Sequence, residues 1–300
     1  MKLTHLRFFL NVAEERHFGR AAERIGMTQP PLSQGIRALE RELGVALFTR
    51  NKRHVELTPV GRQLVGNVRS IVEGADQLPA LARRMAAGEA GSLRLGFVST
   101  ADYSLLPDLV GDYRRAYPDV RIALHEMTSD LQVEAVLQGR IDAGLIIPVT
   151  TPVRPPLAYL PLLREPLIAA APEAWVESGR LASDGRRVGL ADLCRHPLVI
   201  FPRGSSPGFH DIITGYISGH GIVPAIGQEA IQMQTIVSLV SAEMGVALVP
   251  QSLERLGRSG TRYLQLAEPP PLIETGLIWR ESDRSPIMAH FVELARSRRR

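Results

Sequence analysis

Cysteine is almost missing from this chain, which has one such residue, Cys194, among 300. A single thiol excludes a disulfide within the chain and any metal cluster built on cysteine ligands, so we interpret Cys194 as a small core residue. Apolar runs long enough to span a membrane are also missing, and the first ten residues lack the pattern of a secretion signal. These absences predict a cytoplasmic protein with no membrane attachment.

The motifs of common enzyme classes are absent too. The sequence has no dinucleotide-binding G-x-G-x-x-G loop, no Walker A loop, no H-E-x-x-H zinc motif and no G-x-S-x-G elbow. His125 and Glu126 fall in a predicted strand without a second ligand at suitable spacing, and we interpret them as structural. We therefore predict no catalysis, no metal and no cofactor. An enzyme whose reacting groups meet only in the fold stays an alternative.

What the sequence does contain is enough apolar material for sizeable cores, with 45% hydrophobic and 22% charged residues. The length predicts two domains or slightly more. Residues 1–58 hold ten lysines and arginines against six acidic residues, so the whole net charge of +4 lies there. A basic module joined to a neutral body indicates a polyanionic partner for the first part only.

The beginning of the chain predicts a helix-turn-helix. Apolar residues at helical spacing predict one helix over Leu6–Ala13, capped by Thr4, and a shorter one over Phe18–Ile25. Gly26 ends the second helix, and a third follows after a tight turn.

The third helix, over Thr28–Leu43, has two unlike sides. Its apolar stripe consists of Leu32, Ile36, Leu39 and Leu43, and its opposite side of Pro30, Ser33, Gln34, Arg37 and Arg41. Thr28 is a suitable N-cap, and a proline in the first turn sacrifices no hydrogen bond. Short polar groups and arginines opposite a buried stripe suit the DNA major groove, although an ordinary amphipathic surface helix has the same pattern.

Residues 46–57 then read as a β-hairpin. Its tip carries Arg50, Lys52 and Arg53, which predicts contacts with phosphates beside the groove. A basic solvated turn has the same composition, but helix-turn-helix and basic hairpin together favour DNA binding.

Thr58 and Pro59 signal the start of a long helix, as cap and first-turn proline. Apolar residues then alternate steps of four and three, at Leu64, Val68, Ile71, Ala75, Leu78, Ala82 and Met85. A repeat of 3.5 is a coiled-coil seam, so we expect this helix to pair with a second copy. Pro79 interrupts it and predicts a bend or two helical pieces.

From Ser92 onward, strands and helices alternate, which predicts an α/β body of mostly parallel strands. Strands are expected at 93–98, 120–127, 143–147, 167–171, 198–201, 246–249 and 274–279, and helices at 105–116, 131–138, 209–218, 235–243 and 287–296. The length of this body and its proline-rich segment 148–161 predict two lobes with a cleft between them.

Three predicted strands end at turns rich in hydroxyl groups. The turns hold Ser99 and Thr100, Thr128 and Ser129, and Ser205 and Ser206. Ligands of open α/β sheets bind beyond the carboxyl ends of strands, where helix N-termini converge. Each turn alone reads as an N-cap, but three equivalent turns indicate a pocket for a small carboxylate. Arg203 is the candidate counter-charge, and Phe201 or Phe209 the candidate wall.

These motifs resemble those of LysR-type transcriptional regulators. The resemblance rests on LRFF (6–9), FGRAA (18–22), TQPPLS (28–33), LE (39–40), LG (43–44), LF (47–48) and LTPVG (57–61), and continues through LRLG (93–96), GRIDAG (139–144) and GVALVP (245–250). It implies an α/β fold with an all-α winged helix-turn-helix N-terminal domain and a two-lobed, periplasmic-binding-protein-like effector domain.

The resemblance also implies boundaries. Residues 1–58 would bind DNA, 59–88 would form a dimerising linker helix, and 92–300 would bind an effector. Within that last part, lobe I would comprise 92–161 with 267–300, and lobe II 162–266.

Site roles follow from the same resemblance. The DNA-facing residues would be Thr28, Gln29, Pro30, Pro31, Ser33, Gln34 and Arg37 on the helix, with Arg50, Lys52 and Arg53 on the wing. Gln29 would pair with adenine, and Arg37 with guanine or phosphate. Gly35 departs from the larger polar residue often found in this helix, so we expect a base contact to be missing there.

Ser99 and Thr128 are similar to the positions that hold a carboxylate in regulators of aromatic catabolism sensing muconate-type acids. We therefore predict a homo-oligomeric regulator, dimer or tetramer, that activates or represses from operator DNA under a small carboxylate or aromatic-acid effector. The effector residues would be Ser99, Thr100, Thr128, Ser129, Phe201, Arg203, Ser205 and Phe209. An effector-independent DNA-binding repressor is the alternative. Redox-sensing members use a cysteine pair, which this chain lacks.

Overall fold

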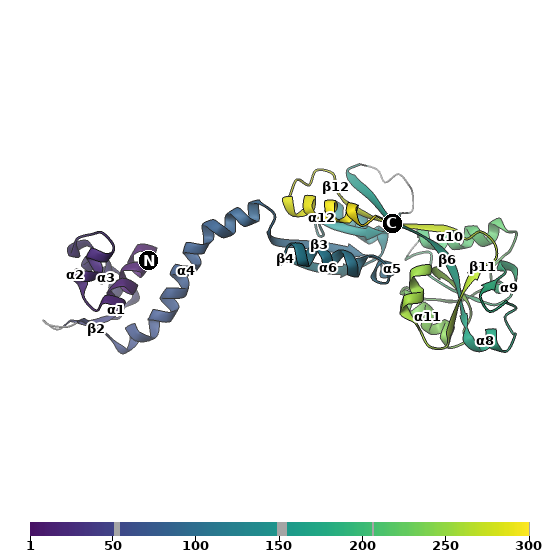
Figure 1. The fold of residues 1–300 in the computed structure, drawn as a ribbon, viewed down its shortest axis with the longest axis horizontal. Helices are drawn as coiled ribbons and strands as arrows, with labels where there is room; N and C mark the ends of the chain where they lie inside the picture. Colours follow the sequence, from purple (N-terminus) through teal and green to yellow (C-terminus); the bar gives the residue numbers. More distant parts are fainter. Residues whose placement is uncertain (51–54, 149–154, 206, 300) are drawn as a thin grey trace. The chain divides into compact units, whose positions relative to one another are not determined.

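The computed structural model describes residues 1–50, 55–148, 155–205 and 207–299, with Arg50 described by its backbone alone. Backbone contacts divide the chain into two units, Met1–Arg83 and Arg84–Arg300. The first unit is mainly helical and the second is α/β (Figure 1). Each unit is described by itself below.

The first unit is a helix-turn-helix with a small hairpin. Its elements are α1 (Leu3–Glu15), α2 (Phe18–Arg24), α3 (Gln29–Leu43), β1 (Phe48–Arg50) and β2 (Val55–Leu57), the two strands being antiparallel (Figure 1). The stripe positions Leu32, Ile36 and Leu39 of α3 are fully buried against α1 and α2. The predicted helix-turn-helix is confirmed.

The helix starts differ in detail from the prediction. Lys2, and not Thr4, occupies the N-cap of α1, because the helix already includes Leu3, which packs on the core. The Nδ1 atom of His17 caps α2, accepting hydrogen bonds from the backbone N–H groups of Gly19 at 3.1 Å and Arg20 at 3.2 Å. Histidine is not among the common cap residues, so this cap cannot be predicted from the residue type.

The long helix α4 (Pro59–Ala86) is continuous through Pro79. The expectation of two helical pieces is therefore wrong. Pro79 is exposed, so water can satisfy the carbonyl group that a proline leaves without an N–H partner. At the start of the helix, Thr58 acts as predicted, its Oγ1 accepting a hydrogen bond from the N–H of Gly61 at 2.9 Å.

The apolar residues of α4 divide into two groups. Val68 and Val72 are buried in the core of the helix-turn-helix. Ile71, Leu78 and Met85 are exposed by 49%, 61% and 50%. The first part of the predicted seam therefore packs into the helix-turn-helix core of the same chain. Ile71, Leu78 and Met85, which we call the exposed row, remain in solvent.

The second unit is built on a sheet that has eight strands within the described ranges. Its order is β4-β3-β5-β12-β6-β11-β7, and β10 also pairs with β6. The strands are β3 (Ala90–Phe97), β4 (Asp119–Glu126), β5 (Ala143–Ile146), β6 (Leu157–Pro172), β7 (Arg187–Val188), β10 (Ala247–Pro250), β11 (Thr261–Leu266) and β12 (Leu272–Arg280). A separate pair consists of β8 (Leu198–Ile200) and β9 (Ile226–Glu229).

The prediction of mostly parallel strands is wrong. β3 pairs in parallel with β4 and β5, but β10, β11 and β12 are all antiparallel to β6. The reason is that β6 is sixteen residues long and carries the chain between two cores, while β12 returns beside it in the opposite direction.

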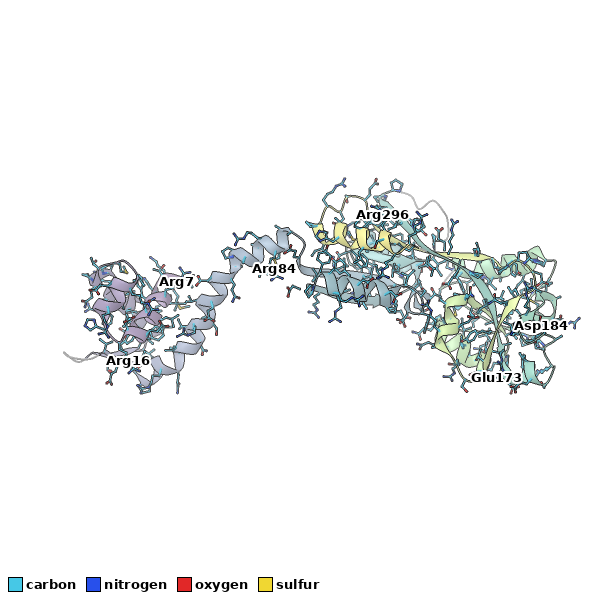
Figure 2. All side chains as sticks on the ribbon, in the orientation of Figure 1. Arg7, Arg16, Arg84, Glu173, Asp184 and Arg296 are labelled. Carbon is cyan, nitrogen blue, oxygen red and sulfur yellow. The ribbon has the colours of Figure 1, made fainter. Side chains whose placement is uncertain are left out.

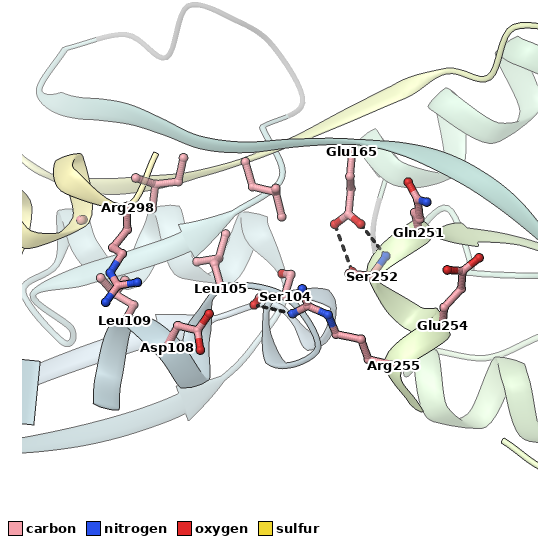
Figure 3. A pocket seen from close by; sticks show the side chains of 13 residues that line it. Ser104, Leu105, Asp108, Leu109, Glu165, Gln251, Ser252, Glu254, Arg255 and Arg298 are labelled. Atoms are coloured by element: carbon pink, nitrogen blue, oxygen red, sulfur yellow. Dashed lines mark hydrogen bonds between the residues drawn. The ribbon is translucent and has the colours of Figure 1, made fainter. Parts of the chain in front are cut away.

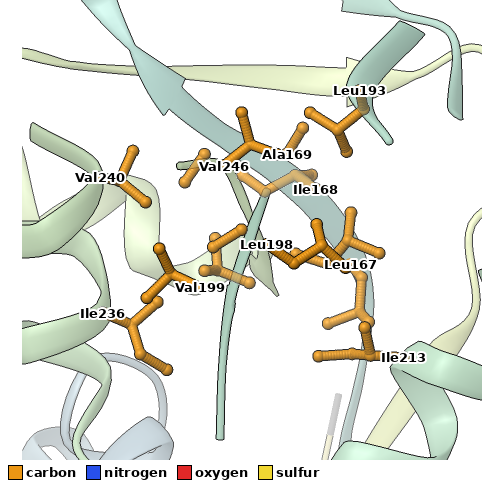
Figure 4. Packing of buried hydrophobic residues seen from close by; sticks show 14 of the residues in the cluster. Leu167, Ile168, Ala169, Leu193, Leu198, Val199, Ile213, Ile236, Val240 and Val246 are labelled. Atoms are coloured by element: carbon orange, nitrogen blue, oxygen red, sulfur yellow. The ribbon is translucent and has the colours of Figure 1, made fainter. Parts of the chain in front are cut away.

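Two hydrophobic cores lie along β6. Leu160 and Leu162, near its start, belong to a core shared with β3 and β12, which we call lobe I. Its apolar end, Leu167–Ala171, belongs to the second core, which we call lobe II. In Figure 4, Leu167 and Ile168 pack among side chains of β8 and of helix α11.

The helices of the second unit surround this sheet (Figure 1). They are α5 (Ser99–Asp102), α6 (Leu106–Ala116), α7 (Ser129–Leu137), α8 (Glu173–Glu177), α9 (Leu190–Leu193), α10 (Pro207–Gly219), α11 (Met233–Ser241) and α12 (Pro286–Ser297), with a 3-10 turn η1 (Gln251–Leu256). Surface ion pairs join neighbours, as between Arg262 of β11 and Glu173 of α8 at 2.6 Å; Glu173 is labelled in Figure 2. Across the described residues, we find no helix with the length and apolarity that a membrane crossing needs.

Candidate functional site

The polar side of α3 is a continuous exposed surface. Thr28, Gln29, Pro30, Pro31, Gln34 and Arg37 are exposed and Ser33 is half-buried. Thr28 occupies the N-cap without a side-chain hydrogen bond, so its hydroxyl group remains available. Gly35 is buried on the side of α3 that packs against α1, so its missing side chain belongs to this helix contact and leaves no gap in the polar side.

Two arginines of α3, Arg37 and Arg41, differ from Arg24 of α2 in their partners. Arg24, on α2, pairs with Glu15 and Glu14, and these carboxylates raise its pKa. By contrast, no carboxylate pairs with Arg37 or Arg41 within the described part of the chain. Uncompensated positive charge therefore faces solvent on the same side as the polar groups, which suits a phosphate-bearing partner.

A half-buried carboxylate, that of Glu40, ties the hairpin to α3. Oε1 of Glu40 accepts hydrogen bonds from the backbone N–H groups of Leu47, at 2.9 Å, and Phe48, at 3.2 Å. This contact fixes the start of β1 beside the second half of α3. The predicted wing cations lie outside the described residues: Lys52 and Arg53 entirely, and Arg50 in its side chain.

A cleft of about 490 Å³ lies between lobe I and lobe II. Seven of the eight predicted effector residues line it: Ser99, Thr100, Thr128, Ser129, Phe201, Ser205 and Phe209. Ser206 lies outside the described residues. The rule that ligands bind beyond the carboxyl ends of strands, which we call the strand-end rule, therefore located the cleft from the sequence.

Arg203 is the exception. It does not line the cleft, and its guanidinium donates two hydrogen bonds to the carboxylate of Asp211 at 2.8 and 3.1 Å. This contact, with a smaller one from His210, lowers the pKa of Asp211 to about 2. Arg203 is therefore not available to pair with a ligand, because Asp211, in the second turn of α10, already binds it.

The hydroxyl groups of the cleft do not act as helix caps. Thr128 precedes α7 without capping it, and its hydroxyl donates to the carboxylate of Asp130. Oγ of Ser129 accepts from the N–H of Ile147 at 3.1 Å. Thr100 is only 4% exposed, and its hydroxyl has no hydrogen-bond partner among the described residues. An unsatisfied buried hydroxyl in a cleft wall is a position for a ligand atom.

Two aromatic rings form the opposite wall. Phe201 and Phe209 are buried and meet edge to face, with ring centroids 5.4 Å apart. Leu131, Ile147 and Ile231 also line the cavity. An apolar wall facing a few polar groups is the usual composition of a small-molecule site.

Sequence reasoning missed the acids of the cleft. Glu126 and Asp130 line the main cavity, and a recess of about 100 Å³ beside it shares Ser99 and Glu126 and adds Asp102. None of the described lining residues is a lysine, arginine or histidine. Because Glu126 is the last residue of β4, the strand-end rule that selected Thr128 would have found it too.

A second cavity, of about 320 Å³, contains none of the predicted residues (Figure 3). Glu165 of β6 faces it and accepts hydrogen bonds from the N–H and the hydroxyl of Ser252, at 2.7 and 3.1 Å. Burial raises the pKa of this carboxyl group. Arg255 of η1 donates to the carbonyl of Ser104 at 3.4 Å, from the other side of the cavity.

Comparison with known proteins finds two matching family models and several similar regulators. The model of the bacterial regulatory helix-turn-helix protein, lysR family, matches residues 3–62, and that of the LysR substrate binding domain matches residues 86–300. The HTH-type transcriptional regulator IlvR of Caulobacter vibrioides is 52% identical over 295 residues, covering 98% of this chain and 97% of that protein. BenM of Acinetobacter baylyi, also an HTH-type transcriptional regulator, is 32% identical over 296 residues, covering 99% and 95%.

Among solved structures, full-length CbnR complexed with its target DNA superposes with a TM-score of 0.71 at 29% identity, covering 99% of both chains. These relatives are named as transcriptional regulators and none of them as an enzyme. The two family models together match nearly the whole chain. The chain belongs to the LysR family of DNA-binding transcriptional regulators.

Proposed function

We propose that this regulator binds a specific operator through α3 and that a small carboxylate in the interlobe cleft modulates the binding. As in the sequence prediction, residues 1–58 would bind DNA, residues 59–88 would form the dimer contact and residues 92–300 would bind the effector. The observation that carries the proposal is the exposed polar side of α3, on which Arg37 has no carboxylate partner in the described part of the chain.

Base recognition would use the groups at the start of α3. Gln29 can donate to and accept from the edge of adenine, and Arg37 can donate to guanine or to a phosphate. The hydrogen bonds from Leu47 and Phe48 to Glu40 hold the hairpin beside α3. From there, Arg50, Lys52 and Arg53 would contact the backbone and add affinity without sequence preference.

The exposed row on α4 supports a homo-oligomer, dimer or tetramer. Ile71, Leu78 and Met85 recur every seven residues and would remain in water in a monomer. A partner helix would cover them as a coiled-coil seam. Pairing would set two copies of α3 on half-sites about one helical turn of DNA, or a multiple, apart.

The cleft supports an effector with a carboxylate. Hydroxyl groups and the starts of α7, α10 and α11 border it, and helix starts attract anions. An aromatic acid, as in the muconate-sensing branch, is a second candidate, favoured by the paired rings of Phe201 and Phe209. A bound effector would shift the balance between arrangements of the oligomer on DNA.

The full-length chain and duplexes selected from a random library provide the test. We expect a selected duplex to bind about 10³-fold or more tightly than its scrambled version at 0.15 M salt, and light scattering to give a mass of two or four chains. Equal binding of both duplexes, or a monomer, would contradict the proposal. Specific binding that no cleft ligand alters would favour the effector-independent repressor instead.

A further inference from the structure

The acids that line the cleft have no cation among the described lining residues. Glu126 and Asp130 line the main cavity, and Asp102 lines the recess next to Glu126. In the described ranges, none of the three forms an ion pair with a lysine, arginine or histidine, and no such residue lines either cavity. Carboxylates that converge on a ligand-sized space without a protein cation favour a ligand that carries one.

The same cleft also offers hydrogen-bond donors. Thr100 is 96% buried, and its hydroxyl has no partner among the described residues. Helix α7, nine residues long, begins at Ser129, and its first-turn N–H groups have no partners within the helix. A buried free hydroxyl beside such a helix start suits a carboxylate.

We propose, resting on the proposed function, that the effector is a zwitterion: an α-amino acid with an apolar side chain. Its carboxylate binds at Thr100 and the start of α7. Its ammonium group lies toward Glu126, with Asp102 and the amide of Gln232 at the same edge. The side chain fills the apolar part of the cavity, lined by Ile147, Phe201 and Phe209.

Simpler acids and amines fit this cleft less well. An acid without an ammonium group adds negative charge to a cavity that already holds carboxylates and no described cation, and like charges out of water repel. An amine without a carboxylate leaves the buried hydroxyl of Thr100 unsatisfied. Only a compound with both groups satisfies both the acids and the unpartnered donors of the cleft.

Calorimetry on the full-length chain tests this assignment. The twenty L-amino acids are titrated first, followed, for each that binds, by its des-amino carboxylic acid and its decarboxylated amine, with benzoate and cis,cis-muconate alongside. We expect one or a few apolar amino acids to bind and each truncated analogue to bind about ten- to a hundredfold more weakly, since a hydrogen bond to a charged group is lost.

A variant then isolates the ammonium site. Glu126→Gln should weaken the amino acid about ten- to a hundredfold and leave the des-amino acid unchanged or tighter. Glu281→Gln removes the same charge from an exposed residue that lines neither cavity, and should change nothing.

Three results would overturn the zwitterion: no amino acid binds, benzoate or muconate binds more tightly than every amino acid, or Glu126→Gln leaves the amino acid's affinity intact. None of them touches the proposed operator binding. Failure of the proposed function is read separately, on the same preparation, as equal affinity for selected and scrambled duplexes.

Discussion

Gly35 of α3 lies directly against the ring of Phe8 on α1. A Cβ atom on Gly35 would stand 2.6 Å from Cδ2 and 2.9 Å from Cε2 of that ring, closer than real Cβ contacts come. The two helices therefore approach to a distance that only glycine permits. This contact seats α3 on α1 and so positions the polar side that faces away from it.

Gly35→Ala should consequently destabilise the helix-turn-helix by about 1–3 kcal/mol, the usual cost of overpacking a core. The measurement is hydrogen exchange at the amides of Leu32 and Ile36 in the full-length chain. Gly66→Ala is the matched control, because no atom lies within 4 Å of a Cβ at Gly66 of α4. That variant should gain up to about 1 kcal/mol from helix propensity. Equal protection in the two variants would show that Phe8 moves aside freely.

Arg37→Ala should weaken binding to the selected duplex by about 1–3 kcal/mol, the range for a side chain that reads a base edge. If Arg37 reads a base, the preference for the selected over the scrambled duplex falls as well. If it contacts only a phosphate, both affinities fall together and the salt dependence becomes shallower. Fluorescence anisotropy separates these cases.

Arg195→Ala is the control for Arg37→Ala. It removes the same charge from the effector unit, where Arg195 pairs with Asp192 at 3.1 Å. We expect it to leave both affinities unchanged. Unaltered operator binding by Arg37→Ala itself would mean that DNA contacts another side of α3.

How far the sequence predicted this molecule depends on whether the determining interaction is local. The first and third helices follow from apolar spacing, since Leu6, Phe9 and Leu10 of α1 and Leu32, Ile36 and Leu39 of α3 are buried in the core. The hydroxyl groups of the cleft follow from their position at strand ends. The start of β6 was missed, because Pro161, Arg164 and Glu165 interrupt its apolar pattern.

Interactions between distant segments escaped prediction. Gly35 looked like a gap in the polar side of α3 until α1 was placed against it. Arg203 looked free until α10 brought Asp211 within hydrogen-bond distance. The acids of the cleft escaped prediction for a different reason: Glu126 is the last residue of β4, so the sequence pattern places it within the strand and not in the turn that follows.

Leu78→Glu should shift the oligomer toward monomer. Leu78 is 61% exposed in the single chain, and a charge placed at a coiled-coil seam is left unpaired against apolar partners. We expect the dissociation constant to rise at least about tenfold to a hundredfold, as for loss of a buried leucine. Sedimentation analysis at micromolar concentration measures this.

Gln77→Glu adds the same charge to the neighbouring exposed position and should leave the mass unchanged. If Leu78→Glu also keeps the mass of two or four chains, the exposed row of α4 is not the interface, and another surface must join the copies.

Ser99→Ala combined with Thr128→Ala should abolish the response to the effector while sparing the affinity for operator DNA. Both hydroxyl groups line the cleft and neither lies in the DNA-binding unit. Loss of two hydrogen bonds to a charged ligand predicts a drop in effector affinity of about a hundred- to ten-thousandfold. Ser178→Ala, at an exposed serine outside the cleft, is the control. A double variant that still responds would place the effector elsewhere.

Glu165→Gln should change how stability depends on pH. Burial raises the pKa of Glu165 above its ordinary value of 4.5, so between these two pKa values the folded chain holds a proton that the unfolded chain releases. The contribution of Glu165 is therefore fully present below pH 4.5 and is lost as pH rises through the raised pKa. A glutamine can keep both contacts with Ser252 and has no proton to lose.

Urea midpoints of the wild type and Glu165→Gln between pH 4 and pH 8 provide the test. The stability of the wild type relative to the variant should fall as pH rises, since every other group is common to both chains. Glu281→Gln, at an exposed carboxylate, should give no such trend. If the stability of the wild type relative to Glu165→Gln stays level or increases as pH rises, Ser252 stabilises the ionised carboxylate by more than burial penalises it. The contact of Glu165 between β6 and η1 would then be strongest above neutral pH.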